Sequence, residues 1–267
     1  LFVLKMKYQS NHLSQNLLIS ALNHYNKNKE KSYVVSPAIP ILFFGDIESY
    51  NNSDFKVVTV GLNPSNTEFR LNKTDKYSYE RFPDFNNDYC SLEKSLCNYF
   101  KINPYRRWFN SYEPYLNSLG FSYYPENSHN KVLHTDICSP LATDPTWSKI
   151  SNQEKNYLIK DGFKLWKNTI YEINPDLIII STRFEYVKML NPKKIETLHT
   201  IFKKKDGTKR RPFNLELYKF NLVNRSHLLI YGEPKNTPFS SVSTLDKIKM
   251  GEITSKYLKE NNLTPPF

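Results

Sequence analysis

The chain has little glycine and little cysteine, and it lacks long apolar runs. Only 7 of its 267 residues are glycine, and none forms a GxGxxG or GxxxxGK[ST] pattern, which argues against a dinucleotide or Walker-type nucleotide site. The three cysteines, Cys90, Cys97 and Cys138, form neither a disulfide framework nor a CxxC pair. No apolar run approaches the roughly 18 residues that span a bilayer, and the opening residues are too short in their apolar part for a signal peptide. We therefore expect a cytoplasmic protein with no membrane partner, no metal and no cofactor.

Positive charge, in contrast, is in excess. Lys and Arg number 37 against 26 Asp and Glu, a formal net charge of +11. This imbalance favours a polyanionic partner such as nucleic acid, although charge alone does not name it. Aromatic residues make up 15% of the chain, which suits base stacking and an aromatic core equally well.

Short apolar runs alternate with helical patterns along the chain. Buried strands are predicted at 55–60, 131–137, 176–181 and 228–231, and helices at 13–28, 108–119, 152–173, 184–190 and 244–261. This pattern predicts an α/β fold, a three-layer sandwich with a central four-stranded, mainly parallel sheet. We expect one monomeric domain over 1–267, with an N-terminal helical extension over about 1–40. Its ligand site should lie beyond the carboxyl ends of the strands.

One strongly basic segment surrounds an Asp-Gly turn at Asp206 and Gly207. The turn lies between two apolar runs, so we predict a basic β-hairpin over about 198–220. Its Arg210 and Arg211 are candidate phosphate contacts. The alternative is a solvated loop tip, because charge runs often serve solubility alone.

Two polar segments after predicted strands resemble motifs of the uracil-DNA glycosylase superfamily. The sequence GLNPS at 61–65 follows VVTV and resembles the first active-site motif, which is Gly-x-Asn-Pro-Gly in the mismatch-specific and single-strand-selective branches. The sequence HTDICSPL at 134–141 is similar to the His-Asn-Leu-Cys-Pro-Leu segment of the single-strand-selective branch. The order of strands and helices agrees over about two hundred residues. The resemblance implies a uracil-DNA-glycosylase-like fold and an enzyme that excises a flipped base from DNA.

The first motif supplies the candidate catalytic residue. By resemblance, Asn63 holds the attacking water, Leu62 and Pro64 shape the base pocket, and Ser65 contacts DNA phosphate. The alternative is a plain turn, since Asn-Pro begins turns in any protein.

The second motif departs from the family at Asp136, where the family has the Asn that reads the base. An ionised Asp only accepts hydrogen bonds, so it would repel O4 of uracil and suit the exocyclic amino group of cytosine. Asp136 is therefore the second candidate catalytic residue, and it favours cytosine or a modified cytosine. The alternative is an Asp that caps the following turn. His134 is a candidate base contact or a packed strand histidine.

The remaining candidate residues come from weaker signals. The last family motif is degenerate here, because 233–238 contains no His; Asn236 is a candidate base contact and Lys235 a phosphate contact, or the segment is an ordinary Pro-rich turn. Phe69 and Phe82 are candidates for stacking on the flipped base or for the core. Ser139 and Thr143 are further candidate phosphate contacts.

These features predict a monofunctional DNA glycosylase that hydrolyses the N-glycosidic bond of a modified cytosine and leaves an abasic site. Resemblance to a bacterial anti-phage glycosylase suggests glucosylated 5-hydroxymethylcytosine in phage DNA as the substrate. The alternatives are a repair glycosylase for uracil or another deaminated base, a catalytically silent DNA-binding module, and a small-molecule hydrolase on an unrelated α/β scaffold.

Overall fold

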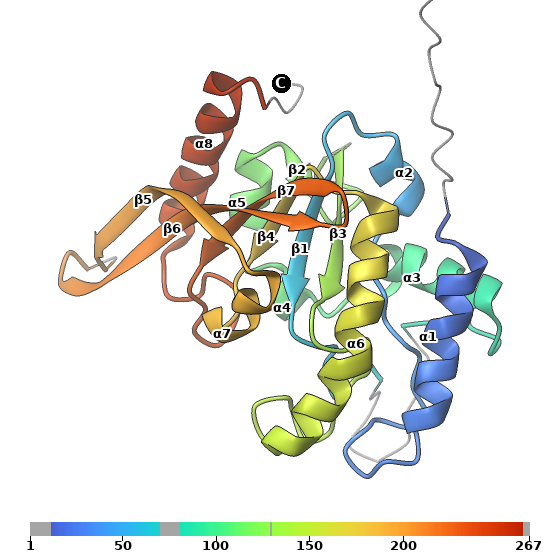
Figure 1. Cartoon of the computed structure of the whole chain (residues 1–267). Helices are drawn as coiled ribbons and strands as arrows, with labels where there is room; N and C mark the ends of the chain where they lie inside the picture. The colour runs from blue at the N-terminus through green and yellow to red at the C-terminus, as the bar shows by residue number, and fades with distance from the viewer. Residues whose placement is uncertain (1–11, 70–80, 129, 205, 264–267) are drawn as a thin grey trace, which may run out of the picture.

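A seven-stranded sheet forms the centre of the molecule (Figure 1). The computed structural model describes residues 12–69, 81–128, 130–204 and 206–263. The strand order is β2-β3-β1-β4-β7-β6-β5, in which neighbours from β2 to β7 are parallel and β6 and β5 are antiparallel. The strands are β1 (Val57–Gly61), β2 (Phe121–Ser122), β3 (Asn130–Asp136), β4 (Leu177–Ile180), β5 (Lys193–Lys203), β6 (Lys209–Leu222) and β7 (Arg225–Gly232).

Helices flank both faces of this sheet. The described helices are α1 (Gln15–Asn28), α2 (Ile47–Asn51), α3 (Tyr89–Ile102), α4 (Arg106–Phe109), α5 (Glu113–Ser118), α6 (Asn152–Ile173), α7 (Phe184–Val187) and α8 (Thr244–Glu260), with short 3₁₀ turns at η1 (Asn66–Glu68) and η2 (Lys188–Leu190). In Figure 1, α6 crosses in front of the sheet with α1 beside it, and α5 and α8 lie behind. None of the described helices has both the length and the apolar character needed to cross a membrane.

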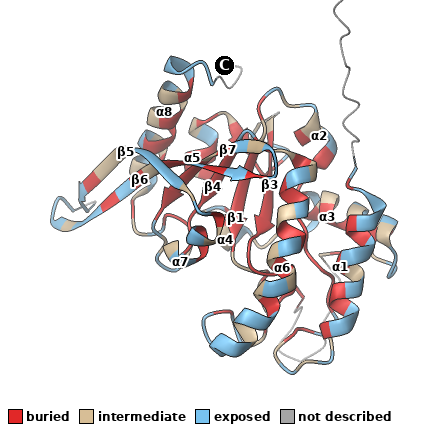
Figure 2. Cartoon of the chain, in the orientation of Figure 1, coloured by how far each residue is buried: buried red, intermediate tan, exposed pale blue. Residues whose placement is uncertain are grey.

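The central strands are apolar on both faces because helices cover both sides. Every residue of Val57–Gly61 and of Leu177–Ile180 is buried, as expected for parallel strands between two helical layers. Figure 2 shows the buried residues concentrated in these strands. The register aligns Gly61 with Asp136 and Ile180 with Tyr231, so the parallel strands end at one side of the sheet. We call this side the carboxyl edge.

The predicted number of strands was wrong. The four predicted strands correspond to β1, β3, β4 and β7, and three more, β2, β5 and β6, complete the sheet. Strand β2 has only two residues, too few to show a periodic pattern. Strand β5 is an edge strand whose sequence is largely polar, so it lacks the apolar run of a central strand. The α/β class and the mostly parallel sheet flanked by helices are confirmed.

Two details of the prediction also differ from the structure. The helix predicted at 108–119 is divided into α4 and α5, with Pro114 in the first turn of α5, where a proline is well tolerated. The basic hairpin predicted at 198–220 is formed by β5 and β6 and extends over 193–222. Its tip has Gly207 at φ +81°, a conformation that favours glycine.

Candidate functional site

The loops after β1 and β3 lie side by side at the carboxyl edge. Backbone pairing continues past the ends of the strands: Ile137 N donates to Gly61 O at 3.0 Å, and Cys138 N donates to Leu62 O at 2.9 Å. The two segments that resemble glycosylase motifs therefore meet in space, although about seventy residues separate them in sequence.

Asn63 is held in one orientation by the opposite loop. Its Nδ2 donates to the backbone oxygens of Pro64 at 3.0 Å and Leu141 at 3.2 Å, and to Thr143 Oγ1 at 3.1 Å. Because carbonyl oxygens only accept hydrogen bonds, these contacts assign the nitrogen side of the amide. Among the described residues none donates to Asn63 Oδ1, which leaves this oxygen as an acceptor on a half-buried side chain.

Asp136 lies at the end of β3, directly level with Gly61 of β1. Its side chain is only 4% exposed, and Oδ1 lies 3.6 Å from His134 Nε2. A Cβ at position 61 would collide with Asp136 Oδ1 and lie 3.1 Å from His134 Nε2. Because Gly61 has no side chain, the space beside it is left for the Asp136 carboxylate.

His134 belongs to a buried polar chain that sequence reasoning did not find. Its Nδ1 lies 2.9 Å from Thr59 Oγ1, which in turn lies 2.5 Å from Tyr123 OH. The Trp108 ring packs edge-on against the imidazole, with centroids 4.8 Å apart. Thr59 and His134 are paired in the β1–β3 register, so this chain depends on the same strand pairing as Asp136. The ring of His134 is fixed on both sides, and its Nε2 is directed toward the carboxylate.

A second carboxyl group, that of Glu68, is buried beside the first motif. Tyr99 OH donates to Glu68 Oε2 at 2.6 Å, and Arg81 Nε lies 3.8 Å from the same oxygen. The pKa of Glu68 is raised to about 7, chiefly by burial. The Tyr99 hydrogen bond and the Arg81 charge act to lower it, and the Asp136 charge adds to the rise. Nothing in the local sequence distinguishes Glu68 from a surface residue, because its partners lie far along the chain.

The aromatic candidates are packed in the core. Phe69 and Phe82 are fully buried and stack on each other, with ring centroids 5.5 Å apart. Phe82 also stacks on Tyr99 at 5.9 Å. Both rings therefore belong to the hydrophobic core.

The candidate phosphate contacts are divided between buried and exposed positions. Ser139 and Thr143 are both buried. Thr143 Oγ1 accepts from Asn63 Nδ2 and so joins the two loops, whereas Ser139 Oγ accepts from Leu141 N within its own loop. Ser65 Oγ accepts from Thr67 N at 3.2 Å and caps η1. Lys235 and Arg211 are exposed.

The last predicted motif, after β7, also lies at the carboxyl edge. Asn236 is exposed, and its backbone N donates to Ser240 Oγ at 3.1 Å. Phe239 N donates to Ser181 Oγ at the end of β4, at 3.0 Å. The loop is therefore anchored one strand away from β1, close to the first two motifs but without a described contact to Asn63 or Asp136.

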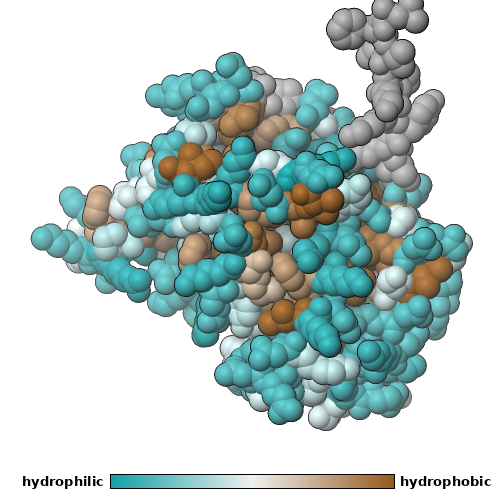
Figure 3. Space-filling view, in the orientation of Figure 1, coloured by the Kyte–Doolittle hydropathy of each residue, from teal (hydrophilic) through white to brown (hydrophobic). Residues whose placement is uncertain are grey.

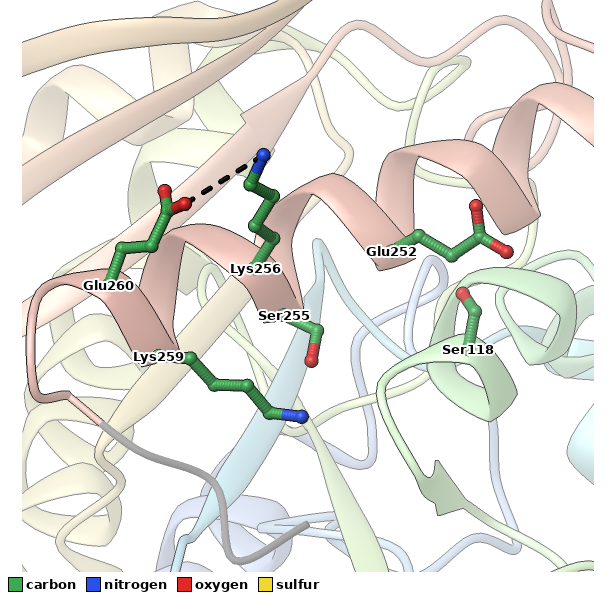
Figure 4. Close-up of a pocket in the computed structure, with 6 residues that line it drawn as sticks. All are labelled: Ser118, Glu252, Ser255, Lys256, Lys259 and Glu260. Atoms are coloured by element: carbon green, nitrogen blue, oxygen red, sulfur yellow. Dashed lines mark ion pairs between the residues drawn. The ribbon is translucent and has the colours of Figure 1, made fainter.

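Two hollows on the described surface lie away from this site. One, of about 340 Å³, lies between α8 and Ser118 and is shown in Figure 4. The other, of about 550 Å³, lies at the amino-terminal ends of β1, β4 and β7 and includes Asp176 and His227. Neither includes Asn63 or Asp136. In the described part of the chain, no group of three or more His, Cys, Asp or Glu side chains is placed to hold a metal ion.

Comparison of the sequence with protein-family models and with curated proteins finds no match to either.

The close approach at Gly61 predicts the effect of a single methyl group. Gly61→Ala places its Cβ against the Asp136 carboxylate and should destabilise the fold by about 1–3 kcal/mol, the usual cost of overpacking a core. Urea unfolding of the two proteins measures this difference. A change below about 0.5 kcal/mol would contradict the contact.

The buried Glu68 carboxyl predicts a pH-dependent stability. Its pKa rises on folding from 4.5 to about 7, so between these pH values the folded protein keeps a proton that the unfolded chain has lost. The contribution of this carboxyl group to the free energy of unfolding is fully present below about pH 4.5. It falls as the pH rises through 7, by about 3 kcal/mol in total. In Glu68→Gln this fall should be absent. Urea unfolding at pH 4.5 and pH 8 tests it, and parallel changes in the two proteins would refute the assignment.

Proposed function

We propose that the protein is a monofunctional DNA glycosylase that hydrolyses the N-glycosidic bond of a modified cytosine and leaves an abasic site. The observation that carries this proposal is the pairing of the two motif loops, which brings an oriented Asn63 and a buried Asp136 carboxylate to one edge of the sheet. The resemblance of both loops to glycosylase motifs supports it.

Asn63 is suited to orient a water molecule. Its Nδ2 is occupied by Pro64, Leu141 and Thr143, so Oδ1 is the group left to accept a hydrogen bond from a bound water. A water held in this way keeps a lone pair for attack on C1′ of the deoxyribose, and fixed orientation is itself a large part of catalysis. Asn63 thus has a role that does not require it to change protonation state.

Asp136 is suited to recognise an amino group. A carboxylate with little solvent needs a hydrogen-bond donor, and the exocyclic amine of cytosine is one. Uracil presents an acceptor oxygen at the same position, which a carboxylate would repel. This complementarity supports cytosine-type bases over uracil.

The reaction balances with one water and no other reagent. The bond from C1′ to the base nitrogen breaks, the water oxygen bonds to C1′, and the proton lost by the water goes to the departing base. The sugar passes through a positively charged, oxocarbenium-like state, which the Asp136 carboxylate would stabilise electrostatically. Glu68 is largely neutral below pH 7, so it adds no second full negative charge there.

Within this class we favour glucosylated 5-hydroxymethylcytosine in phage DNA, and thus a cytoplasmic role in anti-phage defence. Support comes from the departure at Asp136 and from the resemblance to a bacterial anti-phage glycosylase. An enzyme that retained uracil repair would be expected to keep the Asn that pairs with uracil.

The role of Asn63 predicts a large loss of activity on substitution. Asn63→Ala should reduce base excision at least about 100-fold, because oriented general-base and positioning effects contribute 10²–10⁴. Excision is measured as alkali-dependent strand breaks in oligonucleotides that carry cytosine, hydroxymethylcytosine, its glucosylated form or uracil. Thr143→Val is the matched control: it removes one hydrogen bond from Asn63 and should cost less than about tenfold. DNA binding without breaks on every oligonucleotide would instead indicate a DNA-binding module.

The role of Asp136 predicts a change of substrate. Asp136→Asn replaces an acceptor with a group that also donates, so activity on cytosine-type bases should fall and activity on uracil should appear or rise. The same four oligonucleotides measure the ratio of the two activities. A wild-type enzyme active only on uracil, or a variant with an unchanged ratio, would refute the base-reading role.

A further inference from the structure

More than half of the net charge of the protein is concentrated in one hairpin. The residues 193–222, formed by β5 and β6 and called here the basic arm, include nine Lys or Arg against three acids, a net of +6 out of +11 for the chain. Charge of this density attracts a polyanion over distances of about 8 Å in physiological salt.

The arm extends beyond the sheet on the side of the candidate site. Strand β6 runs antiparallel to β7, and Leu215 pairs with Gly232, the last residue of β7. The preceding six residues of β6 therefore continue past the carboxyl edge, over about 20 Å at 3.3 Å per residue. Figure 1 shows this hairpin projecting from the body of the molecule at the left.

The outer part of the arm carries unneutralised cations. Lys203, Lys209 and Arg211 are exposed, and none of the three has an acidic partner within the described residues, whereas the charge of Lys204 acts on Asp206 and lowers its pKa. Lys203 and Lys209 lie directly opposite each other across the two strands, an arrangement that disfavours the hairpin unless an anion is nearby. Figure 3 shows a largely hydrophilic surface on this projection.

The tip of the arm has a defined shape. Asp206 Oδ1 accepts from Thr208 N at 3.0 Å and from Thr208 Oγ1 at 2.6 Å, which closes the turn. At the base of the outer part, Arg210 donates to Ser241 O and lies over the Phe213 ring, which ties the arm to the last loop. A cationic surface that is held in shape loses less entropy on binding than a flexible tail.

The sheet order sets the sideways distance, measured across the strands, between the arm and the site. Strand β6 lies three places from β1 and β5 lies four places, which correspond to about 14 Å and 19 Å at 4.8 Å per strand. Along a DNA strand, phosphates advance about 3.4 Å per base pair. The two distances therefore span about four to six base pairs.

We propose that the basic arm binds the DNA backbone about four to six base pairs to one side of the extruded nucleotide. This inference rests on the proposed function for the position of that nucleotide. The arm contributes affinity and register through phosphate contacts, without reading sequence. Arg211, Lys203 and Lys209 are the contacts, and Arg210 positions the last loop against the arm.

The experiment compares two triple variants with wild type. The arm variant carries Lys203→Gln, Lys209→Gln and Arg211→Gln. The matched control replaces three exposed lysines on α8 and carries Lys249→Gln, Lys256→Gln and Lys259→Gln. The probe is a 24-base-pair duplex with a central tetrahydrofuran abasic-site analogue. At low salt the arm variant should bind roughly 10- to 100-fold more weakly than wild type, and the slope of log K against log salt should be shallower by about 2 to 3. The control should match wild type in both.

Two further duplexes test the spacing. In one duplex the analogue lies three base pairs from the 5′ end of the strand that carries it, and in the other it lies three base pairs from the 3′ end of that strand. Wild type should bind one of these as weakly as the arm variant binds the central probe, because that duplex ends before it reaches the arm. Equal affinity for both would overturn the spacing.

The outcomes separate this proposal from the proposed function. If wild type excises a base and the arm variant binds like the control, the arm proposal fails and the glycosylase stands. If the arm variant loses affinity but no oligonucleotide is cut, the arm stands and the glycosylase fails. A change of sedimentation from dimer to monomer in the arm variant, with unchanged DNA affinity, would make the arm a contact between two copies of the chain and would overturn the proposal.

Discussion

The structure at the carboxyl edge depends on the parallel pairing of β1 with β3. This pairing aligns Gly61 with Asp136 and Thr59 with His134, and it continues into the loops through Ile137 and Cys138. The loop contacts then orient the Asn63 amide. A shift of one residue in this register would turn Asp136 to the other face of the sheet and place Thr135 in its position. In the observed register Thr135 faces α6 instead, where Trp166 Nε1 donates to its hydroxyl at 3.0 Å.

The electrostatics of the edge follow from the same geometry. Two carboxyl groups in a region of low dielectric do not both ionise easily, so one keeps its proton to a higher pH. Burial selects Glu68 for this role, and the charge of Asp136 adds to it. The hydroxyl of Tyr112, which accepts a hydrogen bond from Ser181 N at 3.2 Å, likewise has its pKa raised by burial and by the charge of Asp136. Burial and the charge of Asp136 thus raise the pKa values of both Glu68 and Tyr112 above their ordinary values.

The central part of this fold could be predicted from the sequence because its strands carry their own signal. The apolar runs at β1 and β4 are too continuous for a surface strand, and the polar residues that follow them mark the carboxyl edge. Strand β5 carried no such signal, since an edge strand needs only one covered face and its charged residues resemble a loop. Its place in the sheet depends on hydrogen bonds to β6, which composition does not reveal.

The candidate site could be predicted only where residues close together in the sequence form a recognisable motif. Asn63 follows β1 and Asp136 ends β3, both within recognisable segments, so their placement at the same edge of the sheet could be anticipated from parallel strands. The Tyr123–Thr59–His134 chain and the burial of Glu68 by Tyr99 arise from contacts between residues many tens of positions apart. The orientation of His134 and the raised pKa of Glu68 therefore arise only in the folded chain, where these distant residues are in contact.

Adjacent residues on the arm show why a charge run cannot be interpreted from sequence alone. Arg210 and Arg211 are neighbours, and successive side chains of a strand point to opposite faces. Arg210 therefore turns inward to Ser241 and Phe213, while Arg211 stays in solvent. The first is part of the scaffold that joins the arm to the last loop, and the second is available to a partner. The pleat of the strand, rather than the number of positive charges, decides which cations are free to bind.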